Sequence, residues 1–447
     1  MPQTRYTWLV MSSAIIRPRS ISGTVAVPAS KSHTIRGIVI ATLAEGRSHL
    51  LEPLDSNDAH SCIAACRLLG AAIEEVRDSS GRLRELVIDG TAGSINPPEN
   101  VIDVGNSGTT LYILAGAAAL TRGWSVFTGD HQIRRRPVRS LLNALVDLGA
   151  EAFTTRDEDA PPFCLRGPVR GGRTSIECPT SQYLSSLLIA LPLADGPSTI
   201  DVPLLHERPY VDMTLAWLAD QNVSVEREDY RRFRLAGGQA YRALQTRVAG
   251  DFSSATFFLC AAAITGCELR LEGLDMNDSQ GDKAVIDILQ TMGCSVAFDD
   301  GELVIAGPVR PEDGGAHLDG GEFDLNAMPD ALPALAATAC YAREPVRLIN
   351  VPQARLKETD RIAVMAAELG RMGARVNELP DGLEIVPAES RPVLRGAAVE
   401  GHHDHRVVMA LAIAGLGAAG ATTVSTAESA AVTYPGFFAQ LEMLQNV

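Results

Sequence analysis

Residues Lys31–Leu50 read KSHTIRGIVIATLAEGRSHL, and the plan of this stretch decides the fold because it recurs along the chain. Small or polar residues come first, followed by an apolar, Ala-rich helix, a tight turn and a β-branched strand. Six segments share this plan at spacings of 72 to 77 residues, and a fixed period of this kind indicates repeated structural units. The segments begin at Lys31, Asn106, Ser181, Ser253, Asp330 and Asp404.

A second helix lies between successive copies and ends on a glycine-containing turn before a strand. Examples are CRLLGAAIEEV at Cys66–Val76 and ILQTMGCSVAF at Ile288–Phe298. In the third copy Asn222 replaces the glycine, and asparagine is the next-best residue for a left-handed helix end. Each unit is therefore predicted as strand–helix–strand–helix–strand–strand. Because 447 residues are too many for one ordinary core, we expect two domains or one large repeated architecture.

Composition and charge narrow the class of protein. Apolar residues make up 46% of the chain and aromatic residues 5%, which is typical of an α/β protein packed with small aliphatic side chains. The net charge of −15 argues against nucleic acid as a partner, because phosphate backbones need a basic face. No apolar run reaches the ~18–20 residues of a membrane span. We therefore expect neither a nucleic-acid nor a membrane partner.

The eight cysteines are scattered, and none forms a CxxC pair. We interpret them as buried free thiols in a reducing cytoplasm. Residues 1–20 have no clear small-residue cleavage site, so we expect an N-terminal extension, with Met11 as a second candidate start.

Positive charge lies where a helix disfavours it, at or near the recurring helix starts. A helix N-terminus is already positive, so a cation there is unfavourable unless an anion neutralises it. Any one of these residues alone is explained as a solvated surface charge. Together, in an acidic chain, they predict that several helix N-termini converge on a polyanionic ligand. The six cations are Lys31, Arg36, Arg136, Lys357, Arg361 and Arg406.

Two carboxylates accompany these cations, Asp330 in NAMPDALPALA and Glu358 in KETDR. A carboxylate among cations stays ionised and acts as a base, while a neighbouring one moves a proton. For Asp330, a helix N-cap is an equally good interpretation. The histidines of GHHDHR (His402, His403, His405) lack the spacing of a metal site, and the sequence has no dinucleotide or P-loop motif. We therefore expect neither a metal nor an organic cofactor.

Nine motifs, in order and at family spacing, resemble the 5-enolpyruvylshikimate-3-phosphate synthases, the enolpyruvyl transferases of the shikimate pathway. The resemblance covers the chain from Ile21 to its end. It implies an α/β fold, a two-domain inside-out α/β barrel in which each domain has three βαβαββ repeats with parallel helices. The motifs are PASKSHTIR, GNSGTT, RRRPV, TSQYLSSLL, GDFSSATFFL, MPDALPA, RLKETDR, HDHRVVMAL and TYPGFF.

The resemblance also implies how the chain divides. Crossovers are expected near Val27–Ser30 and Val248–Gly250. One domain then spans residues 29–248, and the other combines residues 1–28 with residues 249–447. The active site is expected in the cleft between them, in a cytoplasmic monomer.

The implied activity transfers the enolpyruvyl group of phosphoenolpyruvate to the 5-hydroxyl of shikimate 3-phosphate through a tetrahedral intermediate and releases phosphate. This reaction serves chorismate and aromatic amino-acid biosynthesis. Asp330 resembles the group that takes the hydroxyl proton. Glu358 and Lys31 resemble the proton donors, and whether Lys31 acts alone stays open.

The resemblance assigns residues to the two substrates. Gly108 leaves space beside phosphoenolpyruvate, so glyphosate is expected to compete there. The residues implied for shikimate 3-phosphate are Lys31, Ser32, Arg36, Thr180, Ser181, Gln182, Asp330 and Lys357. Those implied for phosphoenolpyruvate are Lys31, Gly108, Arg136, Gln182, Arg361 and Arg406.

The chain departs from the family pattern at a few positions. Many members carry a lysine where this chain has Val432, and an arginine where it has Tyr112. Tyr210 matches one branch of the family, whereas Gln132 departs from that branch. We expect these departures to affect the affinity for the substrates and to leave the reaction itself unchanged.

Two alternatives share the fold. The UDP-N-acetylglucosamine enolpyruvyl transferases usually carry a reactive cysteine where this chain has His131, and KETDR fits the shikimate enzymes better. A binding or scaffold protein would be expected to lose Asp330, Glu358 or Lys31, and all three are present.

Overall fold

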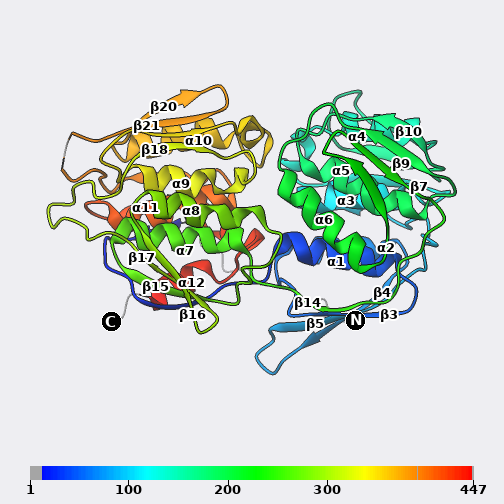
Figure 1. The fold of residues 1–447 in the computed structure, drawn as a ribbon, viewed down its shortest axis with the longest axis horizontal. Helices are drawn as coiled ribbons and strands as arrows, with labels where there is room; N and C mark the ends of the chain where they lie inside the picture. Colours follow the sequence, from blue (N-terminus) through cyan, green and yellow to red (C-terminus); the bar gives the residue numbers. More distant parts are fainter. Residues whose placement is uncertain (1–12, 390, 445–447) are drawn as a thin grey trace.

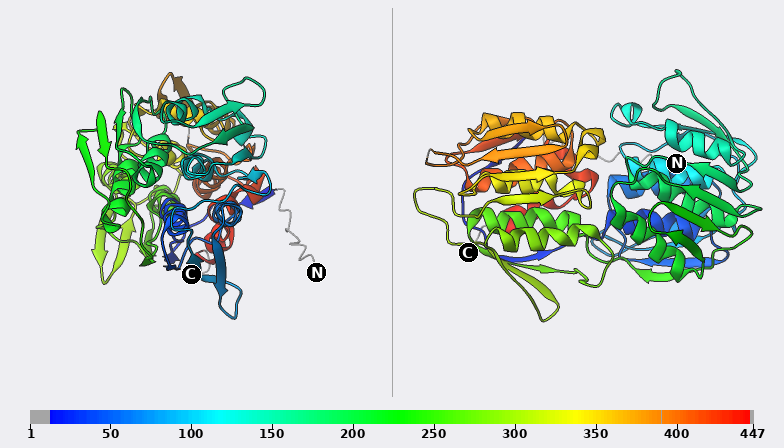
Figure 2. Two further views of the ribbon diagram at one scale, coloured as in Figure 1. Left: turned by 90° about the vertical axis from the view of Figure 1, so that its right-hand side faces the viewer. Right: turned by 45° about the horizontal axis from the view of Figure 1, so that its top comes forward.

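The computed structural model describes residues 13–389 and 391–444 as two lobes that lie side by side (Figure 1). Figure 2 shows the same two lobes from two other directions. The candidate start Met11 lies outside the described residues. None of the helices in the described part of the chain is long and apolar enough to cross a membrane.

The first lobe holds three of the six units. Its helices are α1 (Lys31–Leu43), α2 (Asn57–Leu68), α3 (Gly108–Ala118), α4 (Arg139–Asp147), α5 (Ser181–Ala190) and α6 (Arg208–Asp220). Its strands are β3 (Arg47–Leu51), β4 (Ala72–Arg77), β5 (Leu83–Asp89), β6 (Ile102–Asp103), β7 (Trp124–Thr128), β8 (Glu151–Thr154), β9 (Phe163–Arg166), β10 (Gly172–Ser175), β11 (Ser198–Asp201), β12 (Val225–Glu228), β13 (Arg232–Leu235) and β14 (Gln245–Arg247).

The second lobe holds the other three units. Its helices are α7 (Phe252–Thr265), α8 (Val285–Thr291), α9 (Leu332–Ala339), α10 (Arg361–Arg371), α11 (His405–Gly417) and α12 (Phe437–Met443). Its strands are β1 (Ser13–Ile16), β2 (Gly23–Ala26), β15 (Glu268–Glu272), β16 (Ser295–Asp299), β17 (Glu302–Ala306), β18 (Gly321–Asp324), β19 (Val346–Ile349), β20 (Arg375–Leu379), β21 (Gly382–Val386), β22 (Ala398–Val399) and β23 (Thr422–Ser425).

Polar residues at the head of each repeat start its central helix. Ser30, Ser107 and Thr180 cap α1, α3 and α5, and their side chains accept a hydrogen bond from a backbone N–H of the first turn. Asp251 and Asp404 do the same for α7 and α11. Such caps satisfy N–H groups that have no partner inside the helix. The exception is α9, which follows the 3₁₀ turn η4 (Pro329–Ala331).

Five of the six sheets have the same four-stranded pattern. Each has one parallel pair of strands and an antiparallel hairpin that completes the sheet, as in the order β10-β11-β13-β12, where the parallel strands β10 and β11 flank α5 in sequence. The sixth unit departs from the predicted plan. It has three strands in the order β1-β23-β22, because β1 pairs antiparallel with β23 where the other units place their hairpin.

The two lobes exchange one strand each. Strand β2 precedes α1 in the chain but pairs with β15 of the second lobe, whereas β14 precedes α7 but pairs with β3 of the first lobe. The connections at residues 27–30 and 248–251 therefore run between the lobes, and Ala29 and Gly250 form a β-bridge there. The predicted order of elements along the chain was right for these units. The strand that precedes α1 or α7, however, pairs with a strand of the other lobe and not with one of its own unit.

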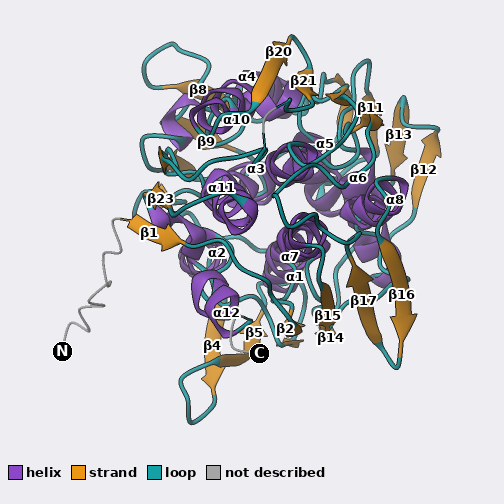
Figure 3. Ribbon diagram, turned by 90° about the vertical axis from the view of Figure 1, so that its left-hand side faces the viewer, coloured by secondary structure: helices purple, strands orange, loops and turns teal. Residues whose placement is uncertain are grey.

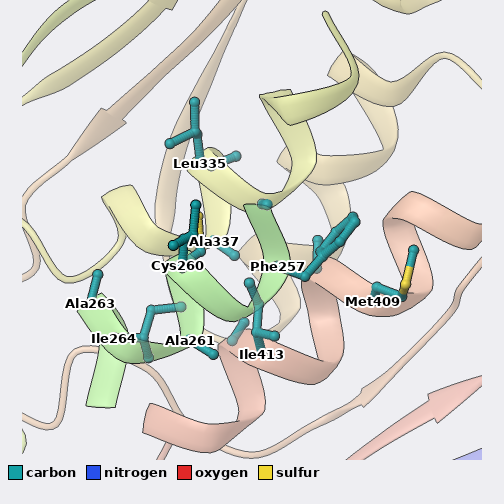
Figure 4. Packing of buried hydrophobic residues seen from close by; sticks show 14 of the residues in the cluster. Phe257, Cys260, Ala261, Ala263, Ile264, Leu335, Ala337, Met409 and Ile413 are labelled. Carbon is teal, nitrogen blue, oxygen red and sulfur yellow. The ribbon is translucent and has the colours of Figure 1, made fainter. Parts of the chain in front are cut away.

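Each lobe has its own apolar core around its central helices. Helices α7, α9 and α11 pack against one another, as do α1 with α3 and α3 with α5. Helices α3, α7 and α11 are buried over their whole length, and Figure 3 shows helices at the centre with strands outside them. Figure 4 shows Phe257, Leu335 and Met409 from α7, α9 and α11 in the second core. All eight cysteines are free, and six are buried.

Candidate active site

A narrow cavity lies between the lobes where the central helices begin. Lys31, Gly108 and Gln182 come from the starts of α1, α3 and α5, and Arg406 comes from the start of α11. Its enclosed volume is about 40 Å³, room for about two or three water molecules. The predicted site residues that line it are Lys31, Gly108, Arg136, Thr180, Gln182, Asp330, Lys357, Glu358, Arg361 and Arg406.

Arg361 is the centre of the ionic network in this cavity. Its guanidinium is 1% exposed and lies 2.8 Å from Asp330 Oδ1 and 2.8 Å from Asp404 Oδ2, and it also bonds the Glu358 carboxylate. Arg406 Nη2 lies 2.9 Å from the other oxygen of Asp330. Arg136 reaches from the first lobe and lies 2.7 Å from Glu358 Oε1. Carboxylates thus neutralise the cations that the sequence placed at the helix starts.

These neighbours control the charge of both catalytic candidates. Burial alone would favour the protonated form of Asp330, but Arg406, Lys357 and Arg361 hold the pKa of its carboxyl far below the usual range. Glu358 is buried too, and Arg361 and Arg136 hold the pKa of its carboxyl well below normal. Both carboxylates are therefore ionised at neutral pH while they pair with these arginines.

The structure tests the helix-cap interpretation of Asp330. Its side chain caps no helix, since η4 begins after Met328 without a side-chain cap and Asp330 turns to two arginines. The N-cap interpretation of Asp330 is therefore wrong. Asp404, by contrast, caps α11 by accepting from Arg406 N at 2.9 Å and also pairs with Arg361.

Three predicted site residues within the described chain, Ser32, Arg36 and Ser181, are not part of the cavity wall. Arg36 is buried and donates to the neutral oxygens of Thr214, Ser32 and Tyr210. Burial lowers the pKa of its guanidinium to about 10, so it stays charged at neutral pH. In this structure Arg36 ties α1 to α6, and its part in binding a substrate remains a prediction.

Sequence reasoning missed several residues that line or border the cavity. His405 and Gln353 line it. His405 had a signal because it precedes Arg406 within HDHR, whereas Gln353 lies four residues before Lys357, outside the motif RLKETDR. Burial lowers the pKa of His405 to about 3, so the ring is neutral. Asp58 pairs with Lys31 at 3.4 Å and had no such signal. Glu207 binds Lys357 from the opposite lobe.

The positions that depart from the family pattern also lie near the cleft. Tyr112 lines the cavity and packs edge-on against Tyr183, with ring centroids 5.0 Å apart. Gln132 Nε2 donates across the cleft to the backbone oxygens of His402 and His403. Val432 lies at the end of η6 (Ala427–Val432) and is half-buried.

The histidines of GHHDHR take separate roles. His402 Nε2 lies 3.0 Å from Glu368 Oε1, and the ring of His403 lies 6.0 Å from that of His131 in the other lobe. His405 is buried at the start of α11. Within the described residues, no three or more His, Cys, Asp or Glu side chains are grouped to hold a metal ion.

Polar contacts beside the cavity join the two lobes. His33 Nε2 lies 3.0 Å from Asp278 Oδ1, and Trp217 donates to the other ring nitrogen of His33 at 2.9 Å. The Tyr210 hydroxyl donates to Asp282 Oδ2 at 2.7 Å. The His33–Asp278 and Tyr210–Asp282 contacts run between the lobes, which are closed on each other in this structure, whereas the Trp217–His33 bond lies within the first lobe.

One of these contacts predicts a pH-dependent stability. Burial, followed by the charge of Asp330, raises the pKa of the Asp282 carboxyl from 3.8 to about 6. The folded state therefore holds this proton more tightly than the unfolded state, so its contribution to stability falls as the pH rises from about 4 to 6. Asp282→Asn keeps an oxygen for Tyr210 and should raise the free energy of unfolding at pH 8 by about 1–3 kcal/mol.

Thermal melts of the wild type and of Asp282→Asn across pH 4–8 check this expectation. The difference in melting temperature should be largest above pH 6 and should vanish towards pH 4. A difference that does not change with pH would contradict the ionisation of Asp282 as its cause.

Comparison with known proteins identifies the family of this chain. The model of the family described as EPSP synthase (3-phosphoshikimate 1-carboxyvinyltransferase) matches residues 15–441. The chain is 50% identical over 422 residues to the 3-phosphoshikimate 1-carboxyvinyltransferase of Acetivibrio thermocellus, covering 94% of this chain and 96% of the relative. The same-named protein of Ruminiclostridium cellulolyticum is 48% identical over the same shares.

Solved structures lead to the same family. An EPSP synthase from Acinetobacter baumannii, solved at 2.37 Å, superposes with a TM-score of 0.77 at 28% identity, over 97% of this chain and 98% of that chain. Together with the match over nearly the whole length, this similarity shows that the chain belongs to the EPSP synthase family.

Proposed function

We propose that the residues gathered in the cleft carry out the family's reaction in the roles described below. The enzyme transfers the enolpyruvyl group of phosphoenolpyruvate to shikimate 3-phosphate and releases phosphate. The observation that carries the assignment of roles is the cavity itself, where Asp330, Glu358 and Lys31 lie among cations from both lobes.

Phosphoenolpyruvate binds to Arg136, Arg361 and Arg406, with Gly108, Gln182 and Lys31 beside them. Guanidinium groups suit this ligand because they bind carboxylate and phosphate oxygens in pairs. In the closed structure the same arginines are engaged by Asp330 and Glu358. The ligand therefore exchanges with these carboxylates, and the small cavity requires the lobes to part before two substrates enter.

Shikimate 3-phosphate binds mainly to the first lobe. We assign its phosphate to the hydroxyls of Thr180 and Ser181 at the start of α5, because a helix N-terminus favours an anion. Asp330 and Lys357 from the second lobe hold its hydroxyls. The remaining assigned residues are Lys31, Ser32, Arg36 and Gln182.

Ligand exchange also explains how Asp330 becomes a base. Its pKa is low because three cations face it. When phosphoenolpyruvate brings negative charge to Arg361 and Arg406, the cations no longer stabilise the Asp330 carboxylate alone, and its affinity for a proton rises. Asp330 then takes the proton of the 5-hydroxyl while that oxygen forms a bond to C2 of phosphoenolpyruvate.

The second proton goes to the methylene carbon of phosphoenolpyruvate. Glu358 and Lys31 both line the cavity and are the proposed donors. Glu358 takes up its proton when phosphoenolpyruvate binds Arg136 and Arg361, the cations that keep its carboxylate ionised in the free site. The tetrahedral adduct then loses phosphate as the bond between C2 and the phosphate oxygen breaks, and the new methyl group returns one proton to the group that supplied it, Glu358 or Lys31, to give the enolpyruvyl ether. Fixed cations stabilise the charge that develops on the departing phosphate.

Gly108 provides a prediction for the phosphoenolpyruvate subsite. A Cβ added there would lie 2.1 Å from Arg136 Nη1 and 2.9 Å from its Cζ, so Arg136 must move. Gly108→Ala should raise KM for phosphoenolpyruvate by about 10- to 100-fold, with little change in the dissociation constant of shikimate 3-phosphate measured alone.

Gly370→Ala is a matched control for Gly108→Ala, because a Cβ at Gly370 in α10 has nothing within 4 Å. Steady-state kinetics with each substrate varied in turn distinguish the two variants. An unchanged KM for phosphoenolpyruvate in Gly108→Ala would remove Gly108 and Arg136 from the proposed subsite. The same assay tests whether glyphosate competes with phosphoenolpyruvate there.

The remaining expectations about the molecule are part of the proposal. The division into residues 29–248 and residues 1–28 plus 249–447 is supported by the two separate cores. A monomer in the cytoplasm is proposed, and the mass of the purified protein in solution tests the first of these.

Release of inorganic phosphate tests the proposed function directly. Purified protein is mixed with phosphoenolpyruvate and either shikimate 3-phosphate or UDP-N-acetylglucosamine. We expect steady release with shikimate 3-phosphate and none above background with the other acceptor. Release with UDP-N-acetylglucosamine alone would assign the chain to the sister reaction.

A further inference from the structure

Glu207 holds an unusual position at the edge of the cleft. It stands just before α6 with a backbone φ of 60°, the left-handed conformation that non-glycine residues seldom adopt. Its side chain is buried, with 2% exposed. A charged, strained and buried residue of this kind needs strong partners.

The partners of Glu207 form a complete anion site. Its Oε2 accepts from the Ser181 hydroxyl at 2.9 Å, from the Ser181 backbone N–H at 3.1 Å and from the Thr180 hydroxyl at 3.1 Å. Its Oε1 binds the ammonium group of Lys357. Two hydroxyls, a backbone N–H at a helix start and an ammonium group are the donors that a phosphate monoester uses.

Three of these four donors belong to two residues assigned above to the phosphate of shikimate 3-phosphate, Thr180 and Ser181. The fourth, Lys357, is assigned to the same substrate. Two anions cannot share one set of donors, because each would lose its hydrogen bonds and repel the other. The phosphate of the substrate and the carboxylate of Glu207 therefore compete.

We propose that Glu207 is a resident anion that occupies the phosphate subsite in the absence of substrate and that shikimate 3-phosphate must displace it. This proposal rests on the function proposed for the site and identifies a residue that determines how strongly a phosphate group binds there. A small anion displaces Glu207 less readily than the whole substrate does, because it makes fewer contacts with the site.

The same exchange links substrate binding to closure of the lobes. Glu207 belongs to the first lobe and Lys357 to the second, so their ion pair is one of the contacts that join the lobes. When the substrate displaces Glu207, Lys357 passes from the carboxylate to the substrate. A bound substrate can thus replace the link that Glu207 supplies.

The experiment compares the wild type with Glu207→Gln and Glu207→Ser by calorimetric titration with shikimate 3-phosphate alone. Gln keeps the size and removes the charge, while Ser removes both the charge and the bulk, so one variant serves if the other fails to fold. Glu226→Gln is the control, because Glu226 is an exposed acid on β12 in the same lobe and gives the same change in net charge.

We expect the dissociation constant of shikimate 3-phosphate to fall about tenfold or more in the Glu207 variants, because a site filled by Glu207 nine-tenths of the time binds about tenfold more weakly. The control should stay within about twofold of the wild type. Equal or weaker binding in both Glu207 variants would overturn the proposal.

A second arm uses inorganic phosphate and does not depend on the reaction. Millimolar phosphate should raise the melting temperature of the Glu207 variants more than that of the wild type or of Glu226→Gln. An equal response in all four proteins would contradict the proposal. Failure of the proposed function would instead appear as no turnover by the wild type, whatever the phosphate arm shows.

Discussion

Replacing Asp330 by asparagine should lower kcat by about 1,000-fold, within the range measured for loss of a general base. The amide keeps the shape of the side chain but cannot take the proton of the attacking hydroxyl. Because the backbone and the other assigned donors remain, the dissociation constant of shikimate 3-phosphate should change by less than about tenfold. Rapid-quench kinetics and a binding titration measure the two quantities separately.

Asp360→Asn is the matched control for this variant. Asp360 caps α10 by accepting from Ala363 N at 3.1 Å, and asparagine caps a helix about as well as aspartate does. Asp360 lies five residues from Arg355 and outside the cavity wall, so the same chemical change there should leave kcat within about threefold. A kcat of Asp330→Asn within tenfold of the wild type would remove Asp330 as the base.

Replacing Arg361 by methionine should lower the free energy of unfolding by about 3–5 kcal/mol, the usual cost of breaking a buried ion pair. The change leaves Asp330, Glu358 and Asp404 without their shared partner in a buried site. Protonation relieves this repulsion, so the deficit should shrink as the pH falls from 7 towards 5. Urea unfolding at several pH values measures it, and KM for phosphoenolpyruvate should rise in parallel.

Arg371→Met provides the control on the same helix. Arg371 is 55% exposed and pairs with Glu368 at 3.2 Å, so its removal should cost at most about 1 kcal/mol. Similar losses for the two variants would show that Arg361 does not neutralise the carboxylates of the site in the way described.

The fold was largely predictable from sequence because its signals are local. Five of the six helix starts are marked by capping residues such as Ser30 and Asp404, and the comparisons confirm the predicted family and fold. The strand exchange between the lobes was not evident from the repeat alone, because β2 and β14 precede helices of one lobe and pair with strands of the other. Pairing of distant strands depends on the whole fold and not on nearby residues.

The site residues were predictable where a cation lies at a helix start, a position that disfavours positive charge. Lys31, Arg361 and Arg406 stood out because cations are unfavourable at helix starts, and the structure brings all three to one cavity. Arg36 carried the same signal but is held by neutral oxygens beside that cavity. Glu207 could not be found in this way, because its role depends on a left-handed turn and on donors that come together only in the folded chain.

The most direct test of the account is the reaction itself in deuterated water. The protein is incubated with phosphoenolpyruvate and shikimate 3-phosphate in D₂O, and the products are followed by proton and phosphorus NMR. The account predicts one phosphate for each enolpyruvyl ether formed, with deuterium in the methylene group of the ether because C3 passes through a methyl group. Ether formation without deuterium in that group, or loss of phosphoenolpyruvate without the ether, would contradict it.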